Sequence, residues 1–181
     1  RKKINAARLA CVDPLNQEFG FQYFADTFYS ANYIESDSLP TMGVDKHLRI
    51  YYNPKFVLSL TIKQLAGVLA HEVMHWILKH ADRCESGGFS PTMWNVAADL
   101  EINDCPKLKR CLPDDCLQAE NFQFPEGKLA EWYYSELCKA EEEEEEEEEQ
   151  EEGEEGDDGD KSEDGSEDSG GEGSEESDGQ D

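Results

Sequence analysis

The sequence lacks any long uninterrupted apolar segment. Its longest apolar stretch, residues 65–78, contains His71, Glu72 and His75, whereas a transmembrane helix needs about 20 consecutive apolar residues. We therefore expect no membrane span. The sequence also has no Gly-rich phosphate-binding loop and no Ser-His-Asp arrangement, so neither nucleotide chemistry nor serine hydrolysis is indicated.

Basic residues are scarce. The chain has 16 Lys and Arg against 43 Asp and Glu, for a net charge of -27, and a charge of this sign disfavours nucleic-acid binding. The imbalance lies after Ala140, where 25 acidic residues accompany a single basic one. That segment has too few apolar side chains to offset the entropy lost on ordering. We therefore predict a folded domain over residues 1–140 and a disordered acidic tail over residues 141–181.

The six cysteines include no Cys-x-x-Cys pair. This pattern favours free thiols in a reducing compartment, and we expect a cytoplasmic protein. Disulfides or a second, structural metal site remain alternatives, and only Cys105, Cys111 and Cys116 are close enough in sequence to suggest the latter.

Residues 71–75 read His-Glu-Val-Met-His, the HExxH pattern of zinc proteases. Histidines four residues apart share one face of a helix, so His71 and His75 can bind the same metal ion. Glu72 follows His71 by about 100° of rotation, which places its carboxylate beside the metal rather than on it. The pattern predicts one Zn²⁺ ion, with Glu72 as the catalytic base.

A helix carrying this motif is expected from Ile62 to about Ala81. Thr61 and Gln64 have the spacing of a capping box at its start. The helix is apolar nearly all round, which predicts burial and leaves two histidines without a structural role. His80 would lie about 180° around the helix from His71, where packing or a favourable interaction with the helix dipole is expected rather than metal ligation.

A second helix is expected to start at Ser90 and to run to Asn103, with a proline in its first turn. Asp99 shares a face with apolar residues, and an inward carboxylate is rare unless it is paired or bound to metal. We therefore predict Asp99 as the third zinc ligand. A role in orienting a ligating histidine is the alternative for Asp99, and Asp82 is another possible third ligand. Glu101 projects to the other side, where it is expected to be solvated.

Residues 47–52 alternate like a half-buried strand that stops at Asn53-Pro54. A strand at this point could form a cleft edge that accepts an extended peptide. A last helix is expected over residues 128–140. Together these elements predict an α+β fold that is mainly helical with a small β-sheet or hairpin.

Four blocks resemble the putative metallopeptidase domain that usually precedes a von Willebrand factor A-like domain in bacterial and phage proteins. The blocks are residues 49–54, 69–75, 94–103 and 126–134. The resemblance implies a zincin-like fold, zinc held by His71, His75 and an acidic residue matching Asp99, and Glu72 as base. It also implies a MoxR-type AAA ATPase as partner, although an acidic tail rather than an A-like domain follows here.

Two functions from different classes fit these features. One is a zinc peptidase that acts on a protein or peptide substrate, with Tyr133, Tyr134 or Arg83 as candidate donors to the oxyanion. The alternative is a catalytically inactive zinc-binding adaptor whose acidic tail recruits a partner. The tail could equally be a solvating linker.

Overall fold

The computed structural model describes residues 1–15 and 20–154, and residues 144–154 only as helix backbone. The chain divides into two compact units, residues 1–143 and 144–181, and the following description concerns the first. It is mostly helical and contains one small sheet, which confirms the predicted α+β class. The helices are α1 Lys2–Val12, α2 Ala25–Ser30, α3 Pro54–Ser59, α4 Ile62–Ile77, α5 His80–Gly87, α6 Pro91–Asn103, α7 Pro106–Lys109 and α8 Ala130–Glu154, with 3-10 turns η1 Gln22–Phe24 and η2 Ala119–Phe122; the strands are β1 Asn32–Glu35, β2 Met42–Val44 and β3 Arg49–Tyr52.

The sheet has the strand order β1-β3-β2. β3 pairs in parallel with β1 and antiparallel with β2. The expectation that residues 47–52 provide a free cleft edge is therefore wrong, because β3 is the middle strand and both of its sides are paired. β2, one of the two outer strands, lies at the cleft described below. Sequence order did not reveal this, since the parallel pairing joins strands that are not neighbours in the chain.

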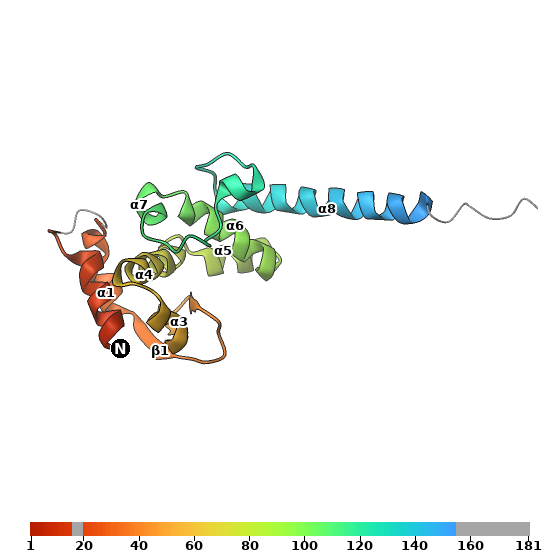
Figure 1. The fold of residues 1–181 in the computed structure, drawn as a ribbon. Coiled ribbons are helices and arrows are strands. Elements are labelled where there is room, and N and C mark those ends of the chain that lie inside the picture. The colour runs from red at the N-terminus through yellow and green to blue at the C-terminus, as the bar shows by residue number, and fades with distance from the viewer. Residues whose placement is uncertain (16–19, 155–181) are drawn as a thin grey trace, which may run out of the picture. The chain divides into compact units, whose positions relative to one another are not determined.

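Helix α4 begins as predicted. Thr61 and Gln64 form the capping box, in which the backbone N–H of Gln64 donates to the Thr61 hydroxyl at 3.1 Å and the Thr61 N–H donates to the Gln64 side chain at 3.0 Å. α1 packs along α4 (Figure 1), and the Cys11 thiol donates to the Ala66 carbonyl across this contact at 3.3 Å. Eight residues of α4 are buried, so the predicted burial is confirmed.

The predicted end of this helix at about Ala81 is wrong. α4 stops at Ile77, and Lys79 adopts a left-handed conformation with φ 56°. α5 then starts at His80 in a new direction. A left-handed residue other than glycine is strained, and composition gave no sign of this break.

Two hydrophobic clusters make up the core. The first cluster joins α1, the sheet, α4, α7 and the residues just after α7, with Ile50, Leu69 and Ile102 among its fully enclosed members. The second cluster joins α6, η2 and the start of α8 around Trp94, Leu100 and Tyr133. α6 therefore contributes to both clusters.

Helix α8 crosses the predicted domain boundary at Ala140, since it continues to Glu154. Glutamate is a good helix former, which is the physical reason for the longer helix despite repulsion between like charges. Of the segment predicted to be disordered, residues 141–181, the structure describes residues 141–154 as helix, and residues 155–181 lie outside the described residues. Within the described residues, no helix is long and apolar enough to cross a membrane, and none of the six cysteines forms a disulfide.

Candidate metal centre

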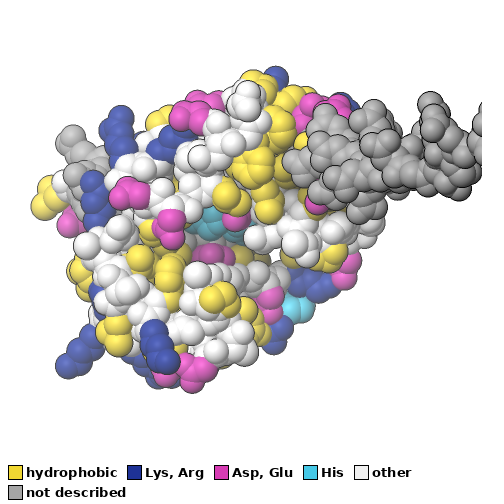
Figure 2. All heavy atoms as spheres, turned by 45° about the vertical axis from the view of Figure 1, so that its right-hand side comes forward, with side chains coloured by type: hydrophobic (Ala, Val, Ile, Leu, Met, Phe, Trp, Pro, Cys, Tyr) yellow, Lys and Arg dark blue, Asp and Glu magenta, His cyan; other side chains and the backbone are white. Residues whose placement is uncertain are grey.

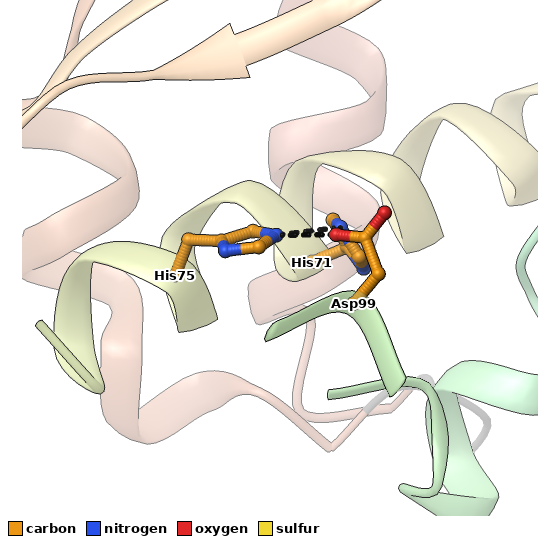
Figure 3. A group of neighbouring side chains, drawn as sticks. All are labelled: His71, His75 and Asp99. Carbon is orange, nitrogen blue, oxygen red and sulfur yellow. Dashed lines mark hydrogen bonds and ion pairs between the residues drawn. The ribbon is translucent and has the colours of Figure 1, made fainter. Parts of the chain in front are cut away.

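Helices α4 and α6 bring His71, His75 and Asp99 together, although 24 residues separate the second histidine from the aspartate in sequence. In Figure 3 the two imidazoles on α4 and the carboxylate on α6 point toward one another. The Nε2 atoms of the histidines lie 2.9 Å apart. Asp99 Oδ1 lies 3.0 Å from the His75 Nε2 and 3.3 Å from the His71 Nε2. These three residues form a group that could hold a metal ion.

These distances fit a metal ion. Two ligand atoms at zinc–nitrogen or zinc–oxygen bond lengths in a tetrahedral site lie about 3.3 Å from each other, close to the separations found here. The side chain of Asn103 supports the same arrangement. Its Nδ2 donates to the Leu117 carbonyl at 2.8 Å, so its Oδ1, 2.9 Å from His71 Nδ1, can only accept. His71 must then carry its proton on Nδ1, which leaves the Nε2 lone pair facing Asp99.

Charge in this group is distributed unevenly. Burial lowers the pKa of His75 to about 4, so this imidazole is neutral at pH 7, the form that binds metals. Burial also acts to lower the pKa of His71, but Asp99 and Glu72 outweigh it and raise that pKa. Burial acts to raise the pKa of Asp99, yet the close approach of its carboxylate to the two histidine rings holds that pKa well below its usual value. The group therefore has a permanent anion beside two nitrogen donors.

Glu72 lies beside the three candidate ligands and is not part of the group. Its side chain is buried, and burial raises the pKa of Glu72 to about 7, with Asp99 acting in the same direction and His71 and the Val44 backbone N–H against it. A carboxyl with a pKa near neutrality can both take up and release a proton. The interaction with Val44 also links Glu72 to strand β2.

These residues lie in an open cleft with a volume of about 970 Å³. Figure 2 shows histidine and acidic side chains in a hollow whose borders are largely apolar and uncharged. The walls come from residues 41–46 of β2 and the following turn, from α4, α5 and α6, and from residues 112–117. The site is thus accessible from solvent and large enough for a peptide side chain and backbone.

Two residues that pattern reasoning assigned to other roles lie behind His75. Its Nδ1 is 2.9 Å from His80 Nδ1, and His80 Nε2 is 3.2 Å from Glu101 Oε2. The expectation that Glu101 is solvated is wrong, since its side chain is 10% exposed. Burial acts to raise the pKa of Glu101, but hydrogen bonds from His80, the Ala130 N–H and Arg83 lower it to about 2. In the sequence, the only signal for His80 and Glu101 is that a further histidine and a further carboxylate occur close to the HExxH motif and to Asp99.

The remaining candidates lie elsewhere. Asp82 is exposed and does not belong to the candidate metal group. The three proposed oxyanion donors do not line the cleft: Arg83 pairs with Glu101 and Glu131, and the hydroxyls of Tyr133 and Tyr134 are hydrogen-bonded to Asp104 and to the Ser90 N–H.

The α+β domain thus combines an HExxH helix with an acidic residue from a second helix, an arrangement that could hold a metal ion. Residues 20–181 match the model of a family described as a putative metallopeptidase domain, and the chain belongs to this family. The match excludes α1 and includes the acidic segment. Comparisons with curated proteins and with solved structures give no match.

Proposed function

We propose that this chain is a zinc-dependent peptidase with a zincin-like fold. The observation that carries the proposal is the convergence of His71, His75 and Asp99 at 2.9–3.3 Å beside Glu72. Two imidazoles and one carboxylate form a donor set that suits zinc and leaves one tetrahedral position open. Bound there, zinc would supply a Lewis acid and lower the pKa of its water to about 7.

Glu72 is the proposed general base. Its buried carboxylate, next to His71 along α4, would accept a proton from the attacking water and deliver it to the leaving amine. Burial raises the pKa of Glu72, which favours uptake of a proton by this carboxylate. Asp99 differs from Glu72 in that its pKa is low, which suits a permanent ligand.

The substrate is proposed to be an extended protein or peptide segment. β2 is an outer strand of the sheet and lines the cleft, so its side away from β3 could add a substrate strand by main-chain hydrogen bonds. Within β2, the Val44 backbone approaches Glu72, so a chain bound there would pass close to the base. The AAA ATPase partner and the cytoplasmic location remain predictions from the sequence.

The decisive variant is Glu72→Gln, which keeps the shape of the side chain and removes the base. We expect wild-type zinc content and a loss of about 10²–10⁴-fold in cleavage of an unfolded protein substrate. Glu85→Gln is the matched control, because Glu85 also lines the cleft but its side chain is 70% exposed and pairs with Lys46. It should retain activity.

Two further results would decide between the proposal and a non-catalytic adaptor. Zinc should be lost from His71→Ala and from Asp99→Ala, as measured by metal analysis of the purified variants. If the wild type cleaves nothing across a peptide library while removal of zinc unfolds it, the metal is structural and the peptidase proposal fails.

A further inference from the structure

The break after α4 is what brings His80 to the metal centre. In an unbroken helix, residues five apart differ by about 140° in direction, so His80 would point away from His75. The left-handed Lys79 instead redirects the chain. The two rings then meet edge to face, with centroids 4.9 Å apart and their Nδ1 atoms 2.9 Å apart.

The direction of this hydrogen bond follows from Glu101. An ionised carboxylate can only accept, so the contact of 3.2 Å between Glu101 Oε2 and His80 Nε2 requires a proton on that nitrogen. When the His80 ring carries only this proton, its Nδ1 has a lone pair and accepts from His75. His75 must therefore carry its own proton on Nδ1, and its Nε2 lone pair faces His71 and Asp99.

The other contacts of these residues hold them in this orientation. Glu101 Oε2 also accepts from the Ala130 backbone N–H at 2.8 Å and from Arg83 at 3.1 Å. The Trp94 indole N–H donates to the His80 carbonyl at 2.9 Å. The side chains of His80 and Glu101 are 4% and 10% exposed, so water competes little with these bonds.

We propose that Glu101 and His80 are positioning residues that select Nε2 of His75 as the metal-binding atom and link it to the first turn of α8. This inference rests on the metal centre of the proposed function and adds two residues outside HExxH to it. Asn103 performs the same task for His71 through a single hydrogen bond, so each histidine ligand has its own partner. Partners of this kind fix the tautomer and orientation of metal-binding histidines, and their removal costs about 10–100-fold in metal affinity.

Zinc dissociation constants, measured by competition with a chelator, test the proposal. His80→Phe keeps a flat ring but offers no acceptor to His75, and we expect its zinc affinity to fall about 10–100-fold. His80→Asn places a carbonyl oxygen close to the former Nδ1 position and should recover most of the loss. His47→Phe is the matched control, because His47 is exposed in the turn between β2 and β3, and its affinity should equal that of wild type.

A spectroscopic measurement on zinc-loaded wild-type protein needs no variant to fold. Long-range ¹H–¹⁵N correlation spectra of the imidazoles should place a proton on Nδ1 of His75 and on Nε2 of His80. Zinc bound through Nδ1 of His75, or His80→Phe with wild-type affinity, would overturn the inference. Failure of the wild type to bind zinc would instead overturn the proposed function, and absence of peptidase activity alone would leave both measurements valid.

Discussion

Gly67 offers a sharp test of how α4 is held in place. It lies one turn before His71, and a Cβ at this position would lie 2.7 Å from both the carbonyl carbon and the carbonyl oxygen of Cys111 and 2.9 Å from the Cys111 Cβ. Ordinary contacts of a Cβ begin at 3.4 Å. Two of the three neighbours are backbone atoms, so no change of rotamer can remove the overlap.

Two opposing effects determine the stability of Gly67→Ala. Alanine is favoured over glycine within a helix by about 1 kcal/mol, whereas overpacking a well-packed core costs typically 1–3 kcal/mol. Because α4 or the segment around Cys111 must move as a unit, the cost belongs at the upper end of that range. We expect the free energy of unfolding to fall by about 1–2 kcal/mol, equivalent to a decrease in Tm of several degrees for a domain of this size.

Urea unfolding of the zinc-free protein measures this difference. Gly43→Ala is the control, since a Cβ there meets nothing within 4 Å, and its effect should stay within about 0.5 kcal/mol. If Gly67→Ala were as stable as wild type, the helix preference would have outweighed the overlap, and the close approach of α4 to Cys111 could not be a constraint on the position of the ligand helix.

Two further pairs of variants test the surroundings of the site by thermal or urea unfolding. Arg83→Met should lower the free energy of unfolding by about 1–2 kcal/mol, because it removes a charged donor from the poorly exposed Glu101. Lys46→Met should lower it by at most about 0.5 kcal/mol, because the ion pair of Lys46 is exposed. Equal losses in the two variants would contradict this reasoning. Thr61→Ala should cost about 1 kcal/mol through loss of the capping box. Ser90→Ala should be nearly neutral, since that side chain makes no capping hydrogen bond, and a loss as large as that of Thr61→Ala would contradict this reasoning.

The parts of the site that sequence could predict depend on local rules. The capping box fixed the start of α4, helical spacing placed His71 and His75 on one face, and the inward position of Asp99 on α6 brought its carboxylate within 3.3 Å of both. Each of these inferences uses only neighbours within about two helical turns. Helix geometry is regular enough over that distance for side-chain directions to be derived from spacing.

The parts that were missed depend on contacts between distant segments. The left-handed Lys79 has no compositional signal, so His80 was placed on the wrong side of a continuous helix. Glu101 was expected to be solvated because its partners, Arg83 and the first residue of α8, lie 18 and 29 residues away. The pairing of β3 with β1 is similarly non-local. Tertiary contacts determine each of these features, and periodicity within a single element does not contain them.

The position of α6 explains how the three candidate ligands are kept so close together. Two nitrogen lone pairs and a carboxylate repel one another unless a cation or proton lies between them, so their separation of 2.9–3.3 Å has to be maintained by the rest of the fold. Leu100 and Ile102, which follow Asp99 on α6, pack into the second and the first cluster, respectively. α6 therefore cannot tilt away from α4 without disturbing both clusters. Packing of this kind holds a metal site in its binding geometry before the cation binds. The affinity for the cation is then not reduced by the free energy that assembling the site would require.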